Sequence, residues 1–208
     1  MRSNPHYFSE KPGGHFKIFE IIVRVRGLTL RLYSSPGIFS YKKLDYGTKV
    51  LIENMKVIDN AKVLDLGTGI GVIGIIYAIL SPSSIVYMSD INERAVKIAK
   101  MNVRKYMLPN CKVIKSNLYE RINEMFDVVI SNPPISAGMK VCYRLISETY
   151  THLNKGGILQ IVARHKKGGR RLMEKMKEVF GNCDVLEKSG GYWIYLSKKK
   201  NKYFIYSV

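Results

Sequence analysis

The chain has few cysteines and no long apolar run. Its three cysteines, Cys111, Cys142 and Cys183, are far apart, lie in apolar segments and form no CxxC pair. We therefore expect reduced core thiols, with no structural disulfide, zinc site or other metal site. The apolar stretch Val72–Leu80 is too short to cross a bilayer, and the first residues lack the apolar core of a signal peptide. These absences favour a cytoplasmic protein with no membrane partner.

Acidic residues are also scarce, since 16 Asp and Glu stand against 34 Lys and Arg, a formal net charge of +18. Such an excess repels itself in the compact state and attracts polyanions. The basic residues gather near the start of the chain, around Arg164–Arg171 and around Lys198–Lys202. Any single cluster is better explained by a solvated surface or a basic tail, and a lysine-rich surface of the kind found in thermophiles could also raise the count. For the whole chain, the balance favours nucleic acid as the partner.

The 208 residues suffice for one α/β domain with a small appendage. We expect a flexible N-terminus at 1–15, a β-hairpin extension at 16–42 and the main domain at 43–208. In the main domain, strand-like and helix-like segments alternate, which requires a parallel sheet with helices on both faces. The last two strands follow each other too closely for a helix, so they should pair antiparallel. This predicts a seven-stranded mixed sheet with the strands Val63–Leu66, Ile85–Met88, Val113–Ile114, Phe126–Ile130, Ile158–Ala163, Cys183–Leu186 and Tyr192–Leu196.

A glycine-rich segment, Asp65-Leu66-Gly67-Thr68-Gly69-Ile70-Gly71, follows the first of these strands and opens a helix. Glycines permit a tight turn and close approach of a ligand, and the helix N-terminus adds N–H donors. Asp65 would repel a pyrophosphate but attract a cationic ammonium group. Asp90 ends the next strand 23 positions after Gly67, near the spacing at which an acid takes ribose hydroxyls; its alternative role is helix capping. A positively charged nucleoside such as S-adenosylmethionine fits this pattern better than NAD.

The motif Asn132-Pro133-Pro134-Ile135 directly follows the apolar run Phe126–Ile130. Proline lacks an N–H and fixes φ, and the residue before it is pushed toward extended geometry. A strand therefore stops abruptly and holds the carboxamide of Asn132 at the sheet edge where open α/β folds bind ligands. Alone, the motif is equally consistent with an ordinary strand-ending turn. Asn117, after the third strand, is placed either for an adenine-edge contact or as a turn residue.

Together these segments resemble the class I S-adenosylmethionine-dependent methyltransferases. The NPP motif resembles the branch that methylates amino groups conjugated to a π-system. The stretch Pro36-Gly37-Ile38-Phe39-Ser40, followed by Leu44-Asp45-Tyr46-Gly47-Thr48, is similar to the RsmC-like family of ribosomal small-subunit RNA guanine-N2 methyltransferases, in particular its compact single-domain archaeal members. The similarity runs from about Gly27 to about Leu196. It implies a Rossmann-like methyltransferase fold in which 43–208 is the catalytic domain.

The resemblance also implies roles for single residues. Asn132 and the Pro133 carbonyl would be catalytic, because two acceptors that grip the amine N–H bonds compensate the charge that develops on nitrogen. The residues expected to hold the cofactor are Asp65, Gly67, Thr68, Gly69, Gly71, Asp90, Ile91, Asn117, Leu118 and Asn132. Those expected to hold an RNA substrate, in first place ribosomal RNA, are Phe39, Pro134, Ile135, Arg164, Lys166, Lys167 and Arg170.

The chain departs from the family at two positions. Ile135 stands where relatives commonly carry an aromatic residue that stacks on a flipped base, so Phe39 or Tyr143 should stack instead, or aliphatic packing replaces stacking. Asn117 stands where many relatives carry Asp. Two other functions remain open: a protein-glutamine methyltransferase of the release-factor type, and a non-catalytic RNA-binding module on the same scaffold. An adenine-N6 enzyme is less favoured without the aromatic after NPP. The sequence does not indicate an oligomeric state.

Overall fold

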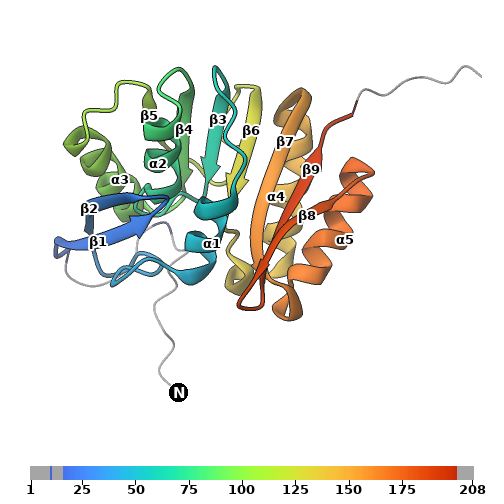
Figure 1. Cartoon of the computed structure of the whole chain (residues 1–208), viewed down its shortest axis with the longest axis horizontal. Coiled ribbons are helices and arrows are strands. Elements are labelled where there is room, and N and C mark those ends of the chain that lie inside the picture. The colour runs from blue at the N-terminus through green and yellow to red at the C-terminus, as the bar shows by residue number, and fades with distance from the viewer. Residues whose placement is uncertain (1–9, 11–15, 201–208) are drawn as a thin grey trace, which may run out of the picture.

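The computed structural model describes residue 10 and residues 16–200. A seven-stranded sheet lies between two helical layers, and a two-stranded hairpin packs outside one of them (Figure 1). The predicted flexible N-terminus, except Glu10, and the last lysine of the C-terminal cluster lie outside the described residues. The strands are β1 Phe19–Val25, β2 Leu28–Ser34, β3 Lys62–Leu66, β4 Ile85–Asp90, β5 Cys111–Lys115, β6 Phe126–Ser131, β7 Leu153–Arg164, β8 Asp184–Ser189 and β9 Tyr192–Lys198. The α-helices are α1 Tyr46–Asn54, α2 Val72–Leu80, α3 Glu93–Lys105, α4 Met139–His152 and α5 Gly169–Phe180.

The strand order in the large sheet is β5-β4-β3-β6-β7-β9-β8. Neighbouring strands are parallel except that β9 runs antiparallel to both β7 and β8, which confirms the predicted mixed sheet. From β3 the chain moves outward through β4 and β5 and then returns to β6 on the other side of β3. This reversal leaves a crevice at the carboxyl ends of β3 and β6, where open α/β folds bind their ligands.

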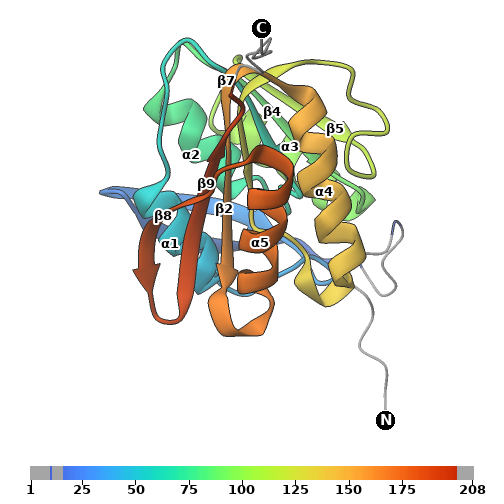
Figure 2. The same ribbon diagram turned by 90° about the vertical axis from the view of Figure 1, so that its right-hand side faces the viewer.

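Two hydrophobic cores cover the two faces of the sheet. Helices α1, α2 and α3 bury one face and α4 and α5 the other (Figure 2). Helix α2 is apolar on every side because the sheet and neighbouring elements enclose it, and residues 72–78 are all buried. By contrast, α5 is amphipathic and buries only Gly169, Leu172, Met176 and Phe180. The helices on both faces agree with the prediction from strand–helix alternation.

The N-terminal hairpin belongs to the first of these cores. Its turn residues Arg26 and Gly27 both have positive φ, 49° and 72°, the geometry of a tight two-residue hairpin. Alternate residues on β1 point inward, so Ile21, Val23 and Val25 are buried with α1, α2 and α3. The hairpin thus shares its core with the main domain.

A single buried amide connects the hairpin to the glycine loop. Asn102 of α3 accepts a hydrogen bond from Tyr33 N at 2.7 Å and donates to Tyr33 O at 3.0 Å and Ile70 O at 2.9 Å. Because the Asn102 side chain is fully buried, breaking one of these bonds leaves a buried polar atom without a partner. The loop conformation and the hairpin position are therefore coupled.

Helix α4 ends at His152 and the chain enters β7 at once, so Gly156 and Gly157 lie beyond the helix end. The glycines lie inside the strand, near an irregularity in the pairing of β6 with β7. A Cβ on Gly157 would lie 3.0 Å from Asn154 O and 3.1 Å from Asp127 O, so close backbone approach explains this glycine better than a helix end does.

Candidate active site

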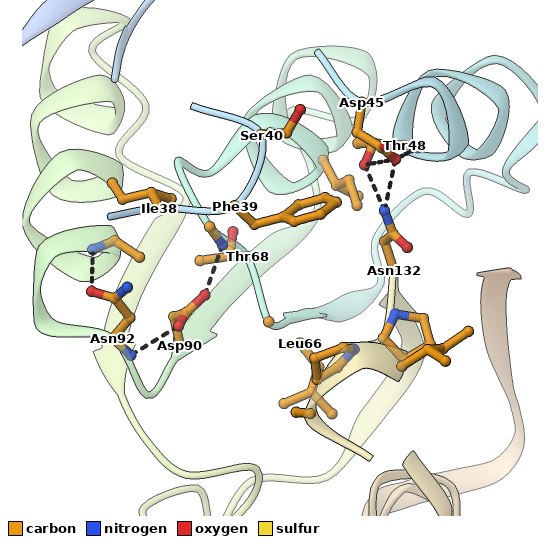
Figure 3. A pocket seen from close by; sticks show the side chains of 18 of the residues that line it. Ile38, Phe39, Ser40, Asp45, Thr48, Leu66, Thr68, Asp90, Asn92 and Asn132 are labelled. Carbon is orange, nitrogen blue, oxygen red and sulfur yellow. Dashed lines mark hydrogen bonds between the residues drawn. The ribbon is translucent and has the colours of Figure 1, made fainter. Parts of the chain in front are cut away.

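A cavity of about 420 Å³ opens at the reversal point of the sheet, at the carboxyl ends of β3, β4 and β6. Its volume is within the range of small-molecule sites. Figure 3 shows that the glycine loop and Asp90 lie on one side and Asn132 on the other, with Phe39 between them. The predicted site residues that line it are Phe39, Gly67, Thr68, Gly69, Asp90, Ile91, Asn117, Leu118, Asn132, Pro133, Pro134, Ile135, Arg164 and Lys167.

The three glycines of the loop serve different purposes. Gly67, Gly69 and Gly71 have φ of 78°, 57° and 91°, values that L side chains rarely adopt. A Cβ on Gly67 would meet nothing within 4 Å, so this position faces open space. A Cβ on Gly71 would lie 3.3 Å from Ala99 Cβ, so this glycine lets α2 approach α3. Only the first two glycines line the cavity.

Asp65 lies beneath the loop and does not line the cavity. It is fully buried. Its Oδ2 accepts hydrogen bonds from the Thr68 hydroxyl and from Gly74 N at 2.9 Å, which fixes the loop on the start of α2. Its Oδ1 has no hydrogen-bond partner among the described residues. Burial raises the pKa of Asp65 to about 7, against the lowering effect of these two donors. An unsatisfied buried oxygen of this type favours a nearby donor or cation.

Asp90 connects the loop with the end of β4. Its Oδ2 accepts from Gly69 N and its Oδ1 from Asn92 N, both at 2.9 Å. The side chain of Asn92, and not that of Asp90, caps α3 by accepting from the backbone of residues 94 and 95. Burial raises the pKa of Asp90, and these two backbone donors oppose the rise. Asp90 is therefore a cavity wall residue, and the helix-capping alternative is wrong.

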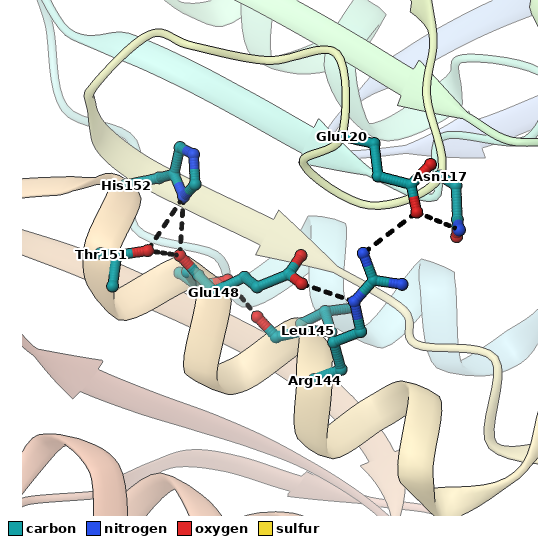
Figure 4. A network of polar contacts seen from close by, with 8 residues as sticks. Asn117, Glu120, Arg144, Leu145, Glu148, Thr151 and His152 are labelled. Carbon is teal, nitrogen blue, oxygen red and sulfur yellow. Dashed lines mark hydrogen bonds and ion pairs between the residues drawn. The ribbon is translucent and has the colours of Figure 1, made fainter.

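Asn117 enters the cavity from the loop after β5. Its Nδ2 donates to Glu120 Oε1 at 2.7 Å, and Glu120 also accepts from Arg144 Nη2 at 3.2 Å (Figure 4). The carboxylate fixes the nitrogen of the amide, because a carboxylate only accepts hydrogen bonds. The oxygen of Asn117 is left to accept from a ligand. The next residue, Leu118, has a positive φ of 51° and lines the same part of the cavity.

Asn132 is held by two residues of the α1 start. Its Nδ2 donates to Thr48 Oγ1 at 2.9 Å and to Asp45 Oδ2 at 3.1 Å. Both N–H bonds of the amide are thus used, and its oxygen has no hydrogen-bond partner among the described residues. The Pro133 carbonyl accepts from Ile135 N at 2.9 Å, which leaves one of its two lone pairs. Both residues line the cavity, and their role as a pair of acceptors stays a prediction.

The aromatic wall differs from expectation. Phe39 lines the cavity and is 48% exposed, whereas Tyr143 of α4 is half-buried against the second core and does not line it. Ile135 packs toward the loop before α5, since a Cβ on Gly168 would lie 3.2 Å from its Cγ2. A second aromatic wall residue, Tyr192 at the start of β9, was not predicted. The Arg164 guanidinium lies 5.1 Å from its ring centroid.

The predicted basic residues divide between two hollows. Arg164 and Lys167 line the main cavity. Lys166 and Arg170 line a second, open hollow beside it together with His165, Gly168 and Arg171. The ring of His165 stacks on Trp193 at a centroid distance of 3.6 Å. The two hollows are therefore lined by residues of one basic segment, 164–171.

Asp45, Thr48 and Tyr192 are among the wall residues that the sequence did not predict. Asp45 and Thr48 belong to the stretch that resembles the RsmC-like family, but the spacing between them indicates only a helix N-cap. Their contact with Asn132 spans 87 and 84 residues, and no local signal reports it. Within residues 10 and 16–200, no helix is long and apolar enough to span a membrane. In the same part of the chain, no group of three or more His, Cys, Asp or Glu is arranged to hold a metal.

The sequence matches known proteins over most of its length. The profile of the methyltransferase small domain family matches residues 29–196. The chain is 33% identical over 197 residues to the uncharacterized protein YbxB of Bacillus subtilis, which covers 93% of this chain and 98% of that protein. It is 33% identical over 204 residues to ribosomal RNA small subunit methyltransferase C of Haemophilus influenzae, covering 95% of this chain. The chain spans 61% of the length of that RNA methyltransferase.

Solved structures with the same architecture include the T. thermophilus 16S rRNA N2 methyltransferase RsmC, in complex with AdoMet and guanosine. The TM-score is 0.77 at 20% identity, over 90% of this chain and 52% of that one. A methyltransferase from Pyrococcus furiosus gives a TM-score of 0.65 at 19% identity, over 74% of this chain and 82% of that one. At these identities the similarity shows the fold alone, and it confirms the predicted Rossmann-like methyltransferase architecture.

Proposed function

The chain belongs to the methyltransferase small domain family, and on that premise we propose that it transfers a methyl group from S-adenosylmethionine to the exocyclic N2 amine of a guanine in RNA. Small-subunit ribosomal RNA, in the cytoplasm, is the proposed acceptor. The observation that carries the proposal is that Pro133 and Asn132, whose amide nitrogen is held by Asp45 and Thr48, line the same cavity as the glycine loop. We propose that Asn132 Oδ1 and the Pro133 carbonyl act there as a pair of acceptors. An amine brings two N–H donors to such a pair.

S-adenosylmethionine is the methyl donor of this family, and the residues present fit it. Gly67 faces open space where a side chain would intrude, and the amide oxygen of Asn117 is left to accept from an adenine amino group. Asp90 is proposed to hold the ribose hydroxyls. Asp65, with one unsatisfied oxygen, supplies negative charge beneath the loop, which favours a cationic ligand.

When bound, this cofactor supplies a methyl carbon on a positively charged sulfur, which is already a good leaving group. The remaining work of the protein is to position the acceptor. The lone pair of a guanine N2 amine is delocalised into the ring, which makes it a poor nucleophile. Asn132 Oδ1 and the Pro133 carbonyl accept from its N–H bonds, favour a pyramidal nitrogen and stabilise the positive charge that develops there. The surplus proton leaves to water afterwards, so no strong base is required.

The surface around the cavity supports an RNA acceptor. The chain carries a net charge of +18, and four basic residues at the cavity mouth were predicted to contact RNA: Arg164, Lys166, Lys167 and Arg170. Two of them line the cavity and two line the adjoining hollow. We propose that the hollow holds backbone phosphates next to the target nucleotide. We also propose that Phe39 packs on the target base, in place of the aromatic residue missing at Ile135.

The proposal is tested by following labelled methyl from S-adenosylmethionine into separate pools of unmodified small-subunit RNA transcript, small ribosomal subunits and protein extract. We expect label in RNA, as N2-methylguanosine after digestion to nucleosides. Label only in protein, as methylglutamine, would establish the release-factor type of activity instead. N6-methyladenosine would refute the guanine assignment. RNA binding without transfer to any pool would identify a non-catalytic module.

A further inference from the structure

The orientation of the Asn132 amide is set from outside the NPP motif. Its Nδ2 donates to Thr48 Oγ1 at 2.9 Å and to Asp45 Oδ2 at 3.1 Å, and the Thr48 hydroxyl itself donates to Asp45 Oδ2 at 3.3 Å. A carboxylate has acceptors only, so the Thr48 hydroxyl proton is directed to Asp45 and its lone pairs are directed to the amide nitrogen. All three side chains line the cavity.

This arrangement excludes the flipped amide. Rotating the amide by half a turn would place Oδ1 of Asn132 against the Asp45 carboxylate, where two acceptors face each other with no proton between them. It would also direct the NH₂ group at the methyl acceptor. An NH₂ group repels the N–H bonds of an amine and attracts a carbonyl oxygen instead. The identity of the side-chain atom that meets the acceptor therefore depends on residues 84 and 87 positions earlier in the chain.

We propose that Asp45 and Thr48 are positioning residues for methyl transfer, which keep the Asn132 oxygen toward the cavity and thereby select an acceptor that presents N–H bonds. The proposal rests on the proposed function, because it assigns these residues to the same amine acceptor. Neither residue touches the reacting atoms in this scheme, and both act through Asn132.

The start of α1 is held firmly enough for this task. The ring of Tyr46 packs on Gly190, where a Cβ would lie 2.6 Å from Tyr46 Cε1, and its hydroxyl lies 2.9 Å from Ser189 Oγ. Conversely, a Cβ on Gly47 would lie 2.6 Å from Tyr192 Cε1. Each aromatic ring thus occupies the space above a glycine of the opposite element. These contacts tie the helix start to the β8–β9 turn.

A purely structural role is the alternative, because Asp45 also caps α1 through Thr48 N at 2.9 Å. Two matched sites in the chain separate the roles. Thr149 is likewise a buried threonine, whose hydroxyl bonds Leu145 O, but it does not line the cavity. Asp127, like Asp45, accepts from one backbone N–H and one Asn Nδ2, those of Lys62 and Asn154. It lies near the opposite end of β6 from Asn132.

The experiment compares Thr48→Val, Thr48→Ser and Thr149→Val, and in parallel Asp45→Asn and Asp127→Asn, in the full chain. For each variant, kcat and KM are measured with unmodified small-subunit RNA, S-adenosylmethionine affinity is measured by calorimetry, and stability by urea unfolding. The side-chain amide of Asn132 is followed by ¹⁵N NMR, with its signals assigned by their loss in Asn132→Ala. This last measurement requires neither cofactor nor acceptor.

We expect Thr48→Val and Asp45→Asn to lower kcat about 100-fold, the order of loss that follows a misplaced catalytic group, while cofactor affinity is unchanged. Thr48→Ser retains the hydroxyl and should keep kcat within about threefold, below the scale of a lost hydrogen bond. In Thr48→Val, one Asn132 amide proton should lose its hydrogen-bonded shift. Thr149→Val and Asp127→Asn should lose stability but keep kcat.

Three results would overturn the inference. These are full kcat in Thr48→Val and Asp45→Asn, an equal loss in the matched controls, or unchanged Asn132 amide signals. A wild-type chain that methylates no RNA refutes the proposed function instead. In that case the Asn132 amide signals still test whether Thr48 and Asp45 orient the amide, because this measurement does not depend on activity. A failure of the proposed function is therefore distinguishable from a failure of the positioning proposal.

Discussion

The ring of Tyr192 packs against Gly47 so closely that a Cβ on residue 47 would lie 2.6 Å from Tyr192 Cε1. Gly47 is the second residue of α1, a position where alanine is otherwise preferred over glycine. The chain therefore keeps a poor helix former there to make room for a cavity wall residue from the far end of the sequence.

This contact predicts a different cost of the same substitution in two backgrounds. In the wild type, Gly47→Ala should destabilise the fold by about 1–3 kcal/mol, the usual cost of overpacking. In a Tyr192→Ala background the ring contacts are gone and only Asp45 Oδ2, at 3.1 Å, stays close to the new Cβ, so Gly47→Ala should cost clearly less than in the wild type. Urea unfolding of the four members of this cycle measures both values. Equal effects in the two backgrounds would show that the ring does not restrain residue 47.

The buried Asp65 predicts a pH dependence of stability. Its pKa rises to about 7 in the folded chain because of burial, above the unfolded value near 3.9. Between these two pH values the carboxyl group is protonated in the folded state and ionised in the unfolded state. The contribution of Asp65 to the free energy of unfolding therefore falls as pH rises from about 4 to 7 and is constant above that. The loss is at most about 4 kcal/mol. The wild type should therefore lose more stability between pH 5 and 8 than Asp65→Asn, which cannot ionise. Parallel curves for the two proteins would exclude this shift.

Alanine substitutions at two glycines with similar backbone geometry distinguish the effect of backbone strain from an effect on cofactor binding. Gly67 and Gly181 have φ of 78° and 69°, and neither would place a Cβ within 4 Å of another atom. Alanine at either position should cost about 1–2 kcal/mol through the left-handed backbone. Only Gly67→Ala should also weaken S-adenosylmethionine binding, by about tenfold or more, equivalent to roughly 1.4 kcal/mol. Calorimetry on the two variants decides this, and equal affinities would remove Gly67 from the cofactor site.

Asn132→Ala should abolish methyl transfer to RNA while S-adenosylmethionine still binds, because the substitution removes an acceptor for the amine and leaves the glycine loop intact. Single-turnover transfer and calorimetry measure the two properties separately. Asn154→Ala, at the other end of the sheet, is the control for loss of a buried amide bond, here to Asp127. Substantial turnover in Asn132→Ala would show that this side chain is not catalytic.

The basic hollow predicts a salt-dependent contribution to RNA binding. Reversing Lys166 and Arg170 to Glu should weaken binding and reduce the slope of log affinity against log salt, since fewer counterions are released. The control is the same charge change at Lys155 and Lys198. Lys155 lies near the start of β7 and Lys198 at the end of the antiparallel β9, so both are at the other ends of the strands from the hollow. Unchanged affinity and slope in the first pair would identify the hollow as ordinary solvated surface.

The fold was predictable where the signals are local. The Pro133-Pro134 turn ends β6, the glycines follow β3, and the short link between β8 and β9 excludes a helix, so the mixed sheet follows from spacing alone. The position of β9 between β7 and β8 was not predicted, because it depends on pairing between distant segments.

The residues of the candidate site were likewise predictable where the signal is local and not where it depends on contacts between distant segments. The residues at the strand ends were found because carboxyl ends of parallel strands meet at one edge. Asp45 and Thr48 were noted only as a family-like stretch, since their bonds to Asn132 span 87 and 84 residues. Asp65 was predicted to attract a cationic group of the cofactor; the structure buries it beneath the glycines, outside the cavity wall, and that role stays a prediction.

The strand order has a consequence for a chain that is still being synthesised. Strand β8 bonds only to β9 within the sheet, and β9, which follows it in the sequence, also supplies the cavity wall through Tyr192. Strand β8 therefore reaches the sheet only through β9, which has to emerge after it and pair with β7. The part of the cavity wall that Tyr192 supplies is thus the last part of the site to be completed.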